Sequence, residues 1–241
     1  MLEDKFYEEA EDKNMLGKQL EEVLRRSGAA LVGYADMEGR NPFGYPVGVA
    51  VAVPVPKDIV VGIEDGPTLE YREMYGILNR KLNHIVTEGV NFLQEKGYRA
   101  YAQTTDVVNL NDNWESPLPH KTVATRAGLG WIGKSCILVT PEYGSSVRIS
   151  SLMTDAPLVC AEPVTQSRCG KCIVCVEACP GHALKGTLWE AGMPREKILD
   201  KDACYKAQVE VMKARTGIET DLCGKCFVVC PYTRKRLNRE K

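Results

Sequence analysis

The sequence has little that would mark a membrane, secreted or nucleic-acid-binding protein. No apolar run approaches the roughly 20 residues that cross a bilayer. The opening stretch MLEDKFYEEAEDK lacks the basic and apolar regions of a secretory signal. The net charge of -1 excludes a general electrostatic attraction to nucleic acids, and three scattered histidines do not make a metal site. We therefore expect a cytoplasmic protein that makes no membrane contact.

Cysteine, in contrast, is abundant and regularly spaced. Residues 169–180 read CGKCIVCVEACP, and residues 223–231 read CGKCFVVCP, with Cys204 between them. The spacing C-x-x-C-x-x-C-x-x-x-C-P is the run found in bacterial ferredoxins, in which three thiolates hold one cluster and the fourth reaches the other. Eight sulfur ligands therefore predict two 4Fe-4S clusters.

The ferredoxin crossover predicts which thiolates share a cluster. The first predicted set is Cys169, Cys172, Cys175 and Cys230, and the second is Cys204, Cys223, Cys226 and Cys179. Gly170 and Gly224 allow the backbone to turn closely around each cluster. The alternatives are structural zinc, which usually has paired C-x-x-C motifs or mixed Cys/His ligands, and disulfides, which the absence of a secretory signal disfavours.

Apolar periodicity predicts an α+β first part. Residues 3–26 and 68–96 have apolar side chains at helical spacing, and residues 47–55 form an apolar run typical of a strand buried on both faces. Residues 29–36 and 98–106 indicate further strands. We expect an α+β cofactor-binding domain over residues 1–158 and a ferredoxin-like domain over residues 159–241.

Shorter elements are predicted from local signals. Residues 120–127 indicate a short helix, and residues 200–215 a helix with Cys204 near its start. Residues 136–140 and 147–154 are strand-like and flank a turn, which predicts a hairpin. The end of the chain, residues 234–241, is expected to be a solvated basic segment.

The stretch before that hairpin contains three glycines, Gly128, Gly130 and Gly133, spaced as G-x-G-x-x-G. This spacing can mark a phosphate-binding loop, but the dinucleotide fingerprint follows a strand and opens a helix. Here the motif follows a helix and leads into a strand. A tight helix-to-strand turn is the structural alternative.

The combination of AGLGWIGK, EYG, LMTDAPL and the cysteine pattern resembles the epoxyqueuosine reductase family of cobalamin-dependent iron–sulfur enzymes. More distantly it is similar to the respiratory reductive dehalogenases. The resemblance is specific over residues 120–234. It implies a nitroreductase-related corrinoid-binding domain followed by a bacterial-type two-cluster ferredoxin module.

The same resemblance implies that the glycine motif lies at the corrinoid pocket. The positions that match it are Gly128, Leu129, Gly130, Trp131, Gly133 and Lys134. Glycines would let a flat macrocycle approach the backbone, and an indole would form an apolar wall. An alternative occupant of such a domain is FMN.

The proton donor is where the chain departs from the family. The resemblance places an aspartate seventeen residues before the motif tryptophan, and here that position is Trp114. Its neighbours Asp112 and Glu115 are candidates, together with His120 at the start of the following helix and Tyr101. A helix-start role for His120 and a packing role for Tyr101 are the structural alternatives.

Together these features predict an oxidoreductase that passes electrons through two clusters to a corrinoid and reduces a small or nucleoside-like substrate. The implied electron donor is a ferredoxin or flavodoxin. The near-zero net charge and the absence of the family's helical-repeat region disfavour tRNA as the partner. Two alternatives are an iron–sulfur flavoprotein reductase and an electron-transfer or activating protein for a partner's corrinoid.

Overall fold

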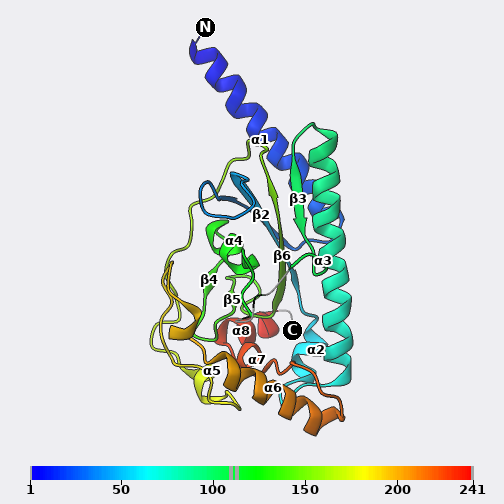
Figure 1. Cartoon of the computed structure of the whole chain (residues 1–241), viewed down its shortest axis with the longest axis vertical. Helices are drawn as coiled ribbons and strands as arrows, with labels where there is room; N and C mark the ends of the chain where they lie inside the picture. The colour runs from blue at the N-terminus through cyan, green and yellow to red at the C-terminus, as the bar shows by residue number, and fades with distance from the viewer. Residues whose placement is uncertain (1, 109–110, 112–113, 240–241) are drawn as a thin grey trace. The chain divides into compact units, whose positions relative to one another are not determined.

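The computed structural model describes residues 2–108, 111 and 114–239, and it has the mixed α and β structure that the sequence predicts (Figure 1). The elements follow in the order α1 (Leu2–Arg26), β1 (Leu31–Asp36), β2 (Val47–Pro54), α2 (Lys57–Gly62), α3 (Leu69–Glu95), β3 (Ala100–Gln103), α4 (His120–Arg126), β4 (Trp131–Ile132), β5 (Leu138–Val139), β6 (Val147–Thr154), α5 (Val174–Glu177), a 3-10 helix (Arg195–Lys197), α6 (Lys201–Thr216), α7 (Lys225–Val228) and α8 (Pro231–Arg239). Across the described part of the chain, no helix combines the length and apolar character of a membrane span.

The chain forms two compact units, each built from separate stretches. Unit 1 contains Met1–Val53, Asn79–Leu129 and Ile149–Pro163, and unit 2 contains Pro54–Leu78, Gly130–Arg148 and Val164–Lys241. Helix α3 and strand β6 contribute residues to both. Unit 2 therefore combines the cysteine-rich region with earlier parts of the chain, and the predicted functional division between residues 158 and 159 stays a prediction.

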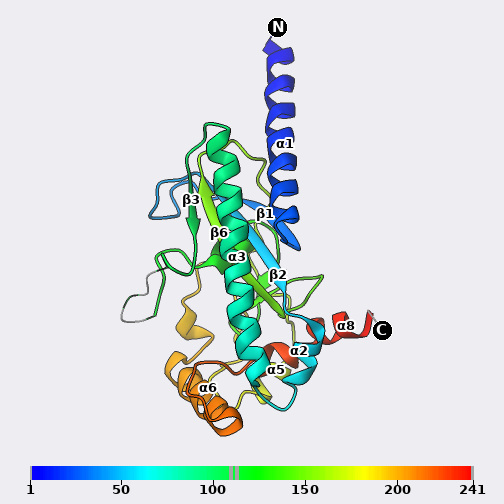
Figure 2. The ribbon, with the colours of Figure 1, turned by 90° about the vertical axis from the view of Figure 1, so that its right-hand side faces the viewer.

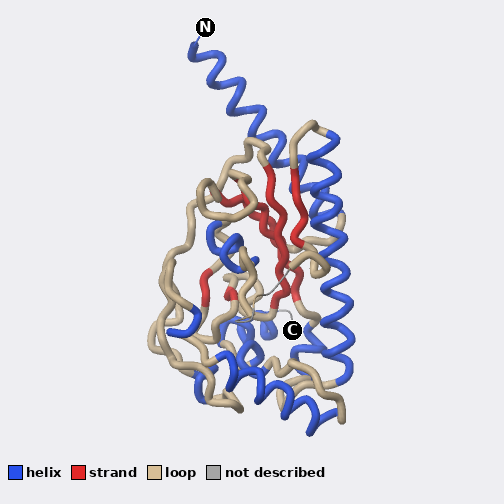
Figure 3. Tube along the Cα trace, viewed as in Figure 1, coloured by secondary structure: helices blue, strands red, loops and turns tan. Residues whose placement is uncertain are grey.

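Unit 1 is organised around a four-stranded sheet with the order β1-β2-β6-β3 (Figure 3). Strand β1 runs antiparallel to β2, and β3 runs antiparallel to β6. Strand β2 is buried along Val47 to Val53, as its continuous apolar run predicts. Strand β1, at the edge of the sheet, is buried only at Ala35, because edge strands lack a second neighbour.

Helices cover both faces of this sheet. Successive strand residues point to opposite faces, and on β1 a methyl group at Gly33 would meet the Ala127 carbonyl oxygen at 2.6 Å, just after α4. The next residue, Tyr34, donates its hydroxyl to the Gly17 carbonyl oxygen of α1 at 2.6 Å. Helices α4 and α1 therefore lie on opposite faces of β1, and α3 runs along the strands (Figure 2).

Unit 2 contains the β4–β5 hairpin, in which Trp131 lies opposite Val139, and the helices of the cysteine-rich region. Helix α6 begins at the N-cap Asp200, whose carboxylate accepts hydrogen bonds from the amides of Asp202 and Ala203. It ends at Gly217, which has a left-handed conformation. Helix α5 contacts α7, and α7 contacts α8.

Several predictions for secondary structure are confirmed, namely the helices over residues 3–26, 68–96, 120–127 and 200–215 and the strand over residues 47–55. The strand predicted over residues 98–106 is shorter, since β3 spans only Ala100–Gln103. The predicted hairpin is wrong. Strand β5 pairs with β4, whereas β6 belongs to the four-stranded sheet, and Cys136 has a positive φ of 62° in the turn before β5.

The prediction of a solvated basic end is also wrong for part of the segment. Residues Pro231–Arg239 form helix α8, with the proline at its first position, where no backbone N–H is needed. The Arg236 side chain is only 6% exposed and donates hydrogen bonds of 3.0 Å to the Val55 carbonyl oxygen and the Ser146 hydroxyl. Arg234 pairs with the Glu64 carboxylate.

Candidate iron–sulfur site and cofactor-binding residues

All eight cysteines of the ferredoxin pattern belong to unit 2. Cys175 lies in α5 and Cys226 in α7, and Cys204 lies near the start of α6. The other five occupy the loops that flank these helices: Cys169, Cys172, Cys179, Cys223 and Cys230. All ten cysteines of the chain are free thiols, so no disulfide joins them.

The thiols fall into neighbourhoods that can be followed through their electrostatic effects. Burial, and after it the charges of Cys169, Cys230 and Cys172, together raise the pKa of Cys175 to about 11. These three are the residues that the ferredoxin crossover places on one cluster with Cys175. Cys230 joins this neighbourhood although it follows Cys175 by more than fifty residues in the chain.

The remaining thiols form the second neighbourhood. Burial and then the charges of Cys179 and Cys223 together raise the pKa of Cys204 to about 11. The Gln208 amide, which donates a hydrogen bond to its sulfur at 3.3 Å, opposes this rise. The pKa of Cys226 is also raised, by burial and then by Cys223 and Cys204 ahead of smaller effects from Cys175 and Cys179. Cys204 and Cys226 thus share the neighbours Cys223 and Cys179, and the assignment of the second set stays a prediction.

This chemistry fits iron–sulfur clusters. Crowded, partly buried thiols oppose one another's ionisation, and a cationic cluster of iron relieves that repulsion by binding the thiolates. The positive φ angles of Gly170 and Gly224, 53° and 80°, are those that a close turn requires.

The two C-G-K-C motifs have the same sequence but different surroundings. In the second motif, Lys225 donates a hydrogen bond to the Glu64 carbonyl oxygen, and Phe227 and Val228 are buried. In the first, the corresponding Lys171 is exposed, and Ile173 and Val174 are 44% and 40% exposed. The second motif is therefore packed into unit 2, whereas the first lies at its surface.

The stretch from Trp131 to Lys134 lies against the first motif. Trp131 is 1% exposed, and its ring meets the Tyr232 ring edge-on, with 4.9 Å between the ring centroids. The Arg168 guanidinium lies 5.5 Å from the centroid of the Trp131 ring. A methyl group at Gly133 would lie 3.6 Å from the sulfur of Cys169. These contacts place the tryptophan strand beside the first set of thiols.

Lys134 completes this contact. Its side chain is buried, with 6% exposure, and its ammonium donates a hydrogen bond of 2.9 Å to the Gly170 carbonyl oxygen. Gly170 stands between Cys169 and Lys171, in the turn of the first motif. A buried cation is therefore attached to the loop that carries the first predicted ligands.

The glycines of the motif also have a packing role. A methyl group at Gly130 would lie 2.1 Å from the Val139 carbonyl oxygen, so the β4–β5 pairing itself requires a residue without a side chain there. Gly128 has a positive φ of 73° and ends the turn after α4. Leu129 contacts the position of Gly33 on β1. Packing and backbone conformation therefore account for Gly128, Leu129 and Gly130 without a ligand. The predicted contact of these residues with a corrinoid stays a prediction.

Of the candidate proton donors, His120 has the most defined surroundings. Its Nδ1 lies 2.9 Å from the Ser151 hydroxyl, and the Gln103 amide donates to that same hydroxyl at 2.7 Å. Ser151 and Gln103 are buried. The Ser151 hydroxyl therefore lies between the Gln103 amide and the His120 ring and links the two side chains.

The other candidates are not brought together with His120 by any contact described. Tyr101 packs against Phe43, with 5.1 Å between the ring centroids. Glu115 receives hydrogen bonds from Asn111 and lies in an exposed loop. Asp112 lies outside the described residues. Sequence reasoning missed Ser151 and Gln103, although the adjacent Ser150 and Ser151 inside the strand-like run 147–154 are a signal for a buried polar network.

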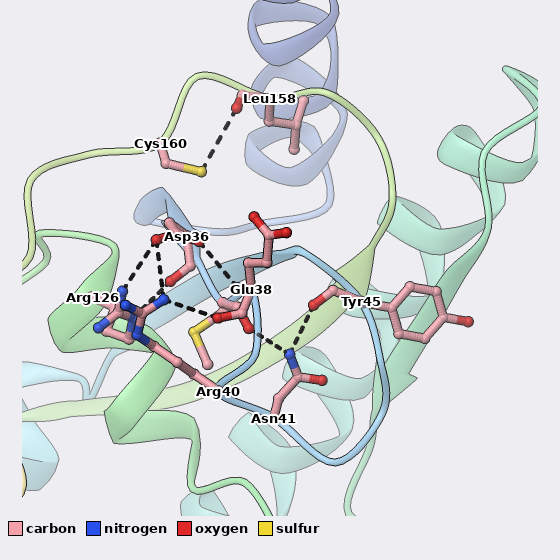
Figure 4. A network of polar contacts seen from close by, with 9 residues as sticks. Asp36, Glu38, Arg40, Asn41, Tyr45, Arg126, Leu158 and Cys160 are labelled. Atoms are coloured by element: carbon pink, nitrogen blue, oxygen red, sulfur yellow. Dashed lines mark hydrogen bonds and ion pairs between the residues drawn. The ribbon is translucent and has the colours of Figure 1, made fainter.

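Cys160, which falls outside the ferredoxin pattern, belongs to unit 1 and lies near a network around Asp36 (Figure 4). Arg126 donates to the Asp36 carbonyl oxygen at 2.6 Å and pairs with its carboxylate at 3.5 Å, and Arg40 pairs with it at 3.4 Å. Burial and then the Asp36 charge raise the pKa of Cys160, and Arg126 opposes this. This network ties the end of β1 to α4.

Comparison with known proteins identifies the cysteine-rich region. Residues 168–233 match the family described as a 4Fe-4S double cluster binding domain, and this range contains all eight thiols of the pattern. The chain therefore carries a domain of the kind that binds two 4Fe-4S clusters.

The chain is similar to curated epoxyqueuosine reductases over part of its length. It is 40% identical over 116 residues to that of Listeria monocytogenes, covering 46% of this chain and 29% of the relative. It is 34% identical over 131 residues to that of Synechococcus, covering 51% and 38%. The matched region is thus less than half of each relative. The family resemblance inferred from the motifs is confirmed.

Solved structures share the fold. A crystal structure of an epoxyqueuosine reductase with an epoxyqueuosine-modified tRNA-Tyr stem loop superposes with a TM-score of 0.60 at 21% identity, covering 92% of this chain and 66% of that chain. A catabolic reductive dehalogenase superposes with a TM-score of 0.68 at 18% identity, covering 91% and 32%. The predicted α+β fold is confirmed.

Proposed function

We propose, from its similarity to the epoxyqueuosine reductases, that the chain is a cobalamin-dependent iron–sulfur reductase acting on a small or nucleoside-like substrate. The observation that carries this proposal is the gathering of eight free thiols in two neighbourhoods within the double-cluster domain. When bound, the clusters would carry single electrons and the corrinoid would supply a strongly reducing metal centre.

The proposed ligands follow the neighbourhoods of the thiols. One cluster would be held by Cys169, Cys172, Cys175 and Cys230, and the other by Cys204, Cys223, Cys226 and Cys179. The first site combines three thiols of the first motif with one of the second. The second site combines two thiols of the second motif with Cys204 of α6 and Cys179 of the first motif. The chain thereby supplies fixed positions and a partly dry environment, which tune how easily a cluster is reduced.

The proposed corrinoid-binding residues are those of the tryptophan motif, namely Gly128, Leu129, Gly130, Trp131, Gly133 and Lys134. The AGLGWIGK sequence supports this, as does the fold shared with a reductive dehalogenase whose structure suggests a mechanism for B12-dependent dehalogenation. Trp131 and Lys134 are buried, which suits residues that line a site from which water is excluded.

His120 is the proposed proton donor. The contact of its Nδ1 with the Ser151 hydroxyl fixes the ring, and an imidazole can transfer a proton near neutral pH. Tyr101, Glu115 and Asp112 remain weaker candidates. A substitution of His120 by Gln is expected to reduce turnover while leaving cofactor content unchanged.

For the substrate, epoxyqueuosine in a tRNA stem loop is the first compound to test, because one relative was solved with such a stem loop. A ferredoxin or flavodoxin is the proposed electron donor.

The decisive experiment is anaerobic purification and reconstitution, followed by analysis for iron, sulfide, cobalt and flavin. We expect iron for two clusters, and an absorbance spectrum of base-off cobalamin after addition of the corrinoid. Flavin in place of cobalt would instead identify an iron–sulfur flavoprotein. Two clusters with neither cofactor would identify an electron-transfer protein.

A further inference from the structure

Residues 131–134, which precede the first thiol set in the chain, lie beside it. Gly133 lies against the sulfur of Cys169, and Lys134 holds the carbonyl oxygen of Gly170 at 2.9 Å. Both contacts lie within unit 2. The tryptophan motif therefore contacts the cluster loop directly, a role separate from the corrinoid contact proposed above.

Trp131 is placed between the two ends of the same thiol set. The guanidinium lying 5.5 Å from its ring belongs to Arg168, which precedes Cys169, and the ring in edge contact belongs to Tyr232, two residues after Cys230. The indole Nε1 is buried, and it has no hydrogen-bond partner among the described residues. An indole N–H can only donate, and buried donors are almost always paired.

Lys134 brings a positive charge close to the same thiol set. Its ammonium is attached to the turn between Cys169 and Cys172 and is shielded from water, with 6% of the residue exposed. Interactions between charges are stronger when water is excluded. Reduction adds a negative charge to a cluster, so a buried cation nearby favours the reduced form.

We infer that Lys134 and Trp131 raise the reduction potential of the cluster held by Cys169, Cys172, Cys175 and Cys230. Lys134 acts through its charge, and Trp131 acts through a hydrogen bond from its Nε1–H to a sulfur of that cluster. Net charge and hydrogen bonds to sulfur are the two quantities by which proteins tune these potentials. This inference rests on the proposed function only in requiring the cluster, and it does not require the corrinoid.

The test is a redox titration of protein that carries its clusters but no cobalamin. Electron paramagnetic resonance measures the reduced fraction of each cluster. Signals are assigned by their loss in Cys175→Ala. Lys134→Met keeps the length of the side chain and removes its charge, so we expect the first cluster's potential to fall and the second to stay unchanged. A tenfold change in the reduced fraction corresponds to about 59 mV for one electron, and we expect about that shift.

Lys171→Met is the matched control, because Lys171 lies in the same loop but is exposed to solvent. We expect a clearly smaller shift there, since water screens its charge. Trp131→Phe keeps the aromatic ring and removes the N–H, and it should lower the same potential without loss of iron. Equal shifts in both clusters, no shift, or equal shifts for Lys134→Met and Lys171→Met would overturn the inference.

If Lys134→Met loses the iron of the first cluster, Lys134→Arg provides the second test. It keeps the charge, so its potential should stay near that of the unmodified protein, and a fall as large as that expected for methionine would contradict the role of charge. Wild-type protein that binds no iron would instead overturn the proposed function. Protein that binds iron but no cobalamin leaves this titration fully informative.

Discussion

Asp155 accepts two hydrogen bonds from Arg99, one from its backbone amide at 2.8 Å and one from its side-chain Nε at 2.7 Å. Arg99 precedes β3 and Asp155 follows β6, so the pair closes the end of the antiparallel β3–β6 ladder. The arginine is largely exposed, whereas the carboxylate is 28% exposed. The aspartate is therefore the better-shielded partner.

This pair predicts a pH dependence of stability. Burial alone would raise the pKa of Asp155, but the hydrogen bonds and charge of Arg99 together hold it below the ordinary value. A carboxyl whose pKa is lower in the folded state stabilises the protein above its unfolded pKa of about 3.9, and this contribution is lost as the pH falls through the folded pKa. Its contribution at neutral pH should be about 0.5–1 kcal/mol, as for a partly exposed pair.

The test is the thermal midpoint of Asp155→Asn against the unmodified protein as a function of pH. The variant should unfold at a lower temperature at pH 7, and the difference should shrink below about pH 4, where the unfolded carboxyl protonates. Loss of clusters in acid affects both proteins alike and cancels in the difference. A gap that widens toward acid pH would contradict the assigned direction of the pKa shift.

The buried hydroxyl of Ser151 gives a second prediction. Ser151→Ala removes the partner of both His120 and Gln103, and buried polar groups left unpaired cost about 1–3 kcal/mol. Urea unfolding should show this loss. The control is Thr105→Ala, which removes a hydroxyl bonded to Asn83 at an exposed position and should change stability by about 0.5 kcal/mol or less. Equal losses in the two variants would exclude a buried network.

The elements that sequence reasoning predicted well are those whose signal is local. Helices α1 and α3 and strand β2 each have a long apolar pattern, so their existence and burial could be inferred without a partner. Strand pairing is not local. Strand β6 was assigned to the wrong neighbour because its position between β2 and β3 depends on residues far away in the chain.

The candidate site shows the same division. Cysteine spacing alone predicts the thiol sets, because a cluster requires ligands at short, regular intervals, and their assignment stays a prediction. It could not show that Lys134 holds Gly170 or that Gln103 and Ser151 orient His120, since those contacts join separate elements. Arg236 is a further example, because a basic residue near a chain end has no sequence signal for its burial against Val55 and Ser146.

The two C-G-K-C motifs give a third prediction, since Phe227 and Ile173 occupy the same position after the second cysteine of each motif. Phe227 is 8% exposed and contacts the Tyr71 ring at 5.9 Å, whereas Ile173 is 44% exposed. Phe227→Ala should therefore destabilise the protein by about 3–5 kcal/mol. Ile173→Ala should cost about 0.5 kcal/mol.

Urea unfolding of the apo forms measures both losses without interference from cluster release. Phe227→Leu, which keeps most of the buried volume, should lie between them. Comparable losses for Phe227→Ala and Ile173→Ala would mean that the two motifs are equally packed, contrary to the structure.

Single cysteine variants test which thiols share a cluster. Cys230 follows the second motif's helix but belongs to the neighbourhood of Cys175, so Cys230→Ala and Cys175→Ala should abolish the same cluster signal and remove about half of the iron. Cys204→Ala should abolish the other signal. Cys160→Ala, in unit 1, is the matched control and should retain both signals and all of the iron. If Cys230→Ala instead removed the signal that Cys204→Ala removes, each motif would hold its own cluster and the crossover would be wrong.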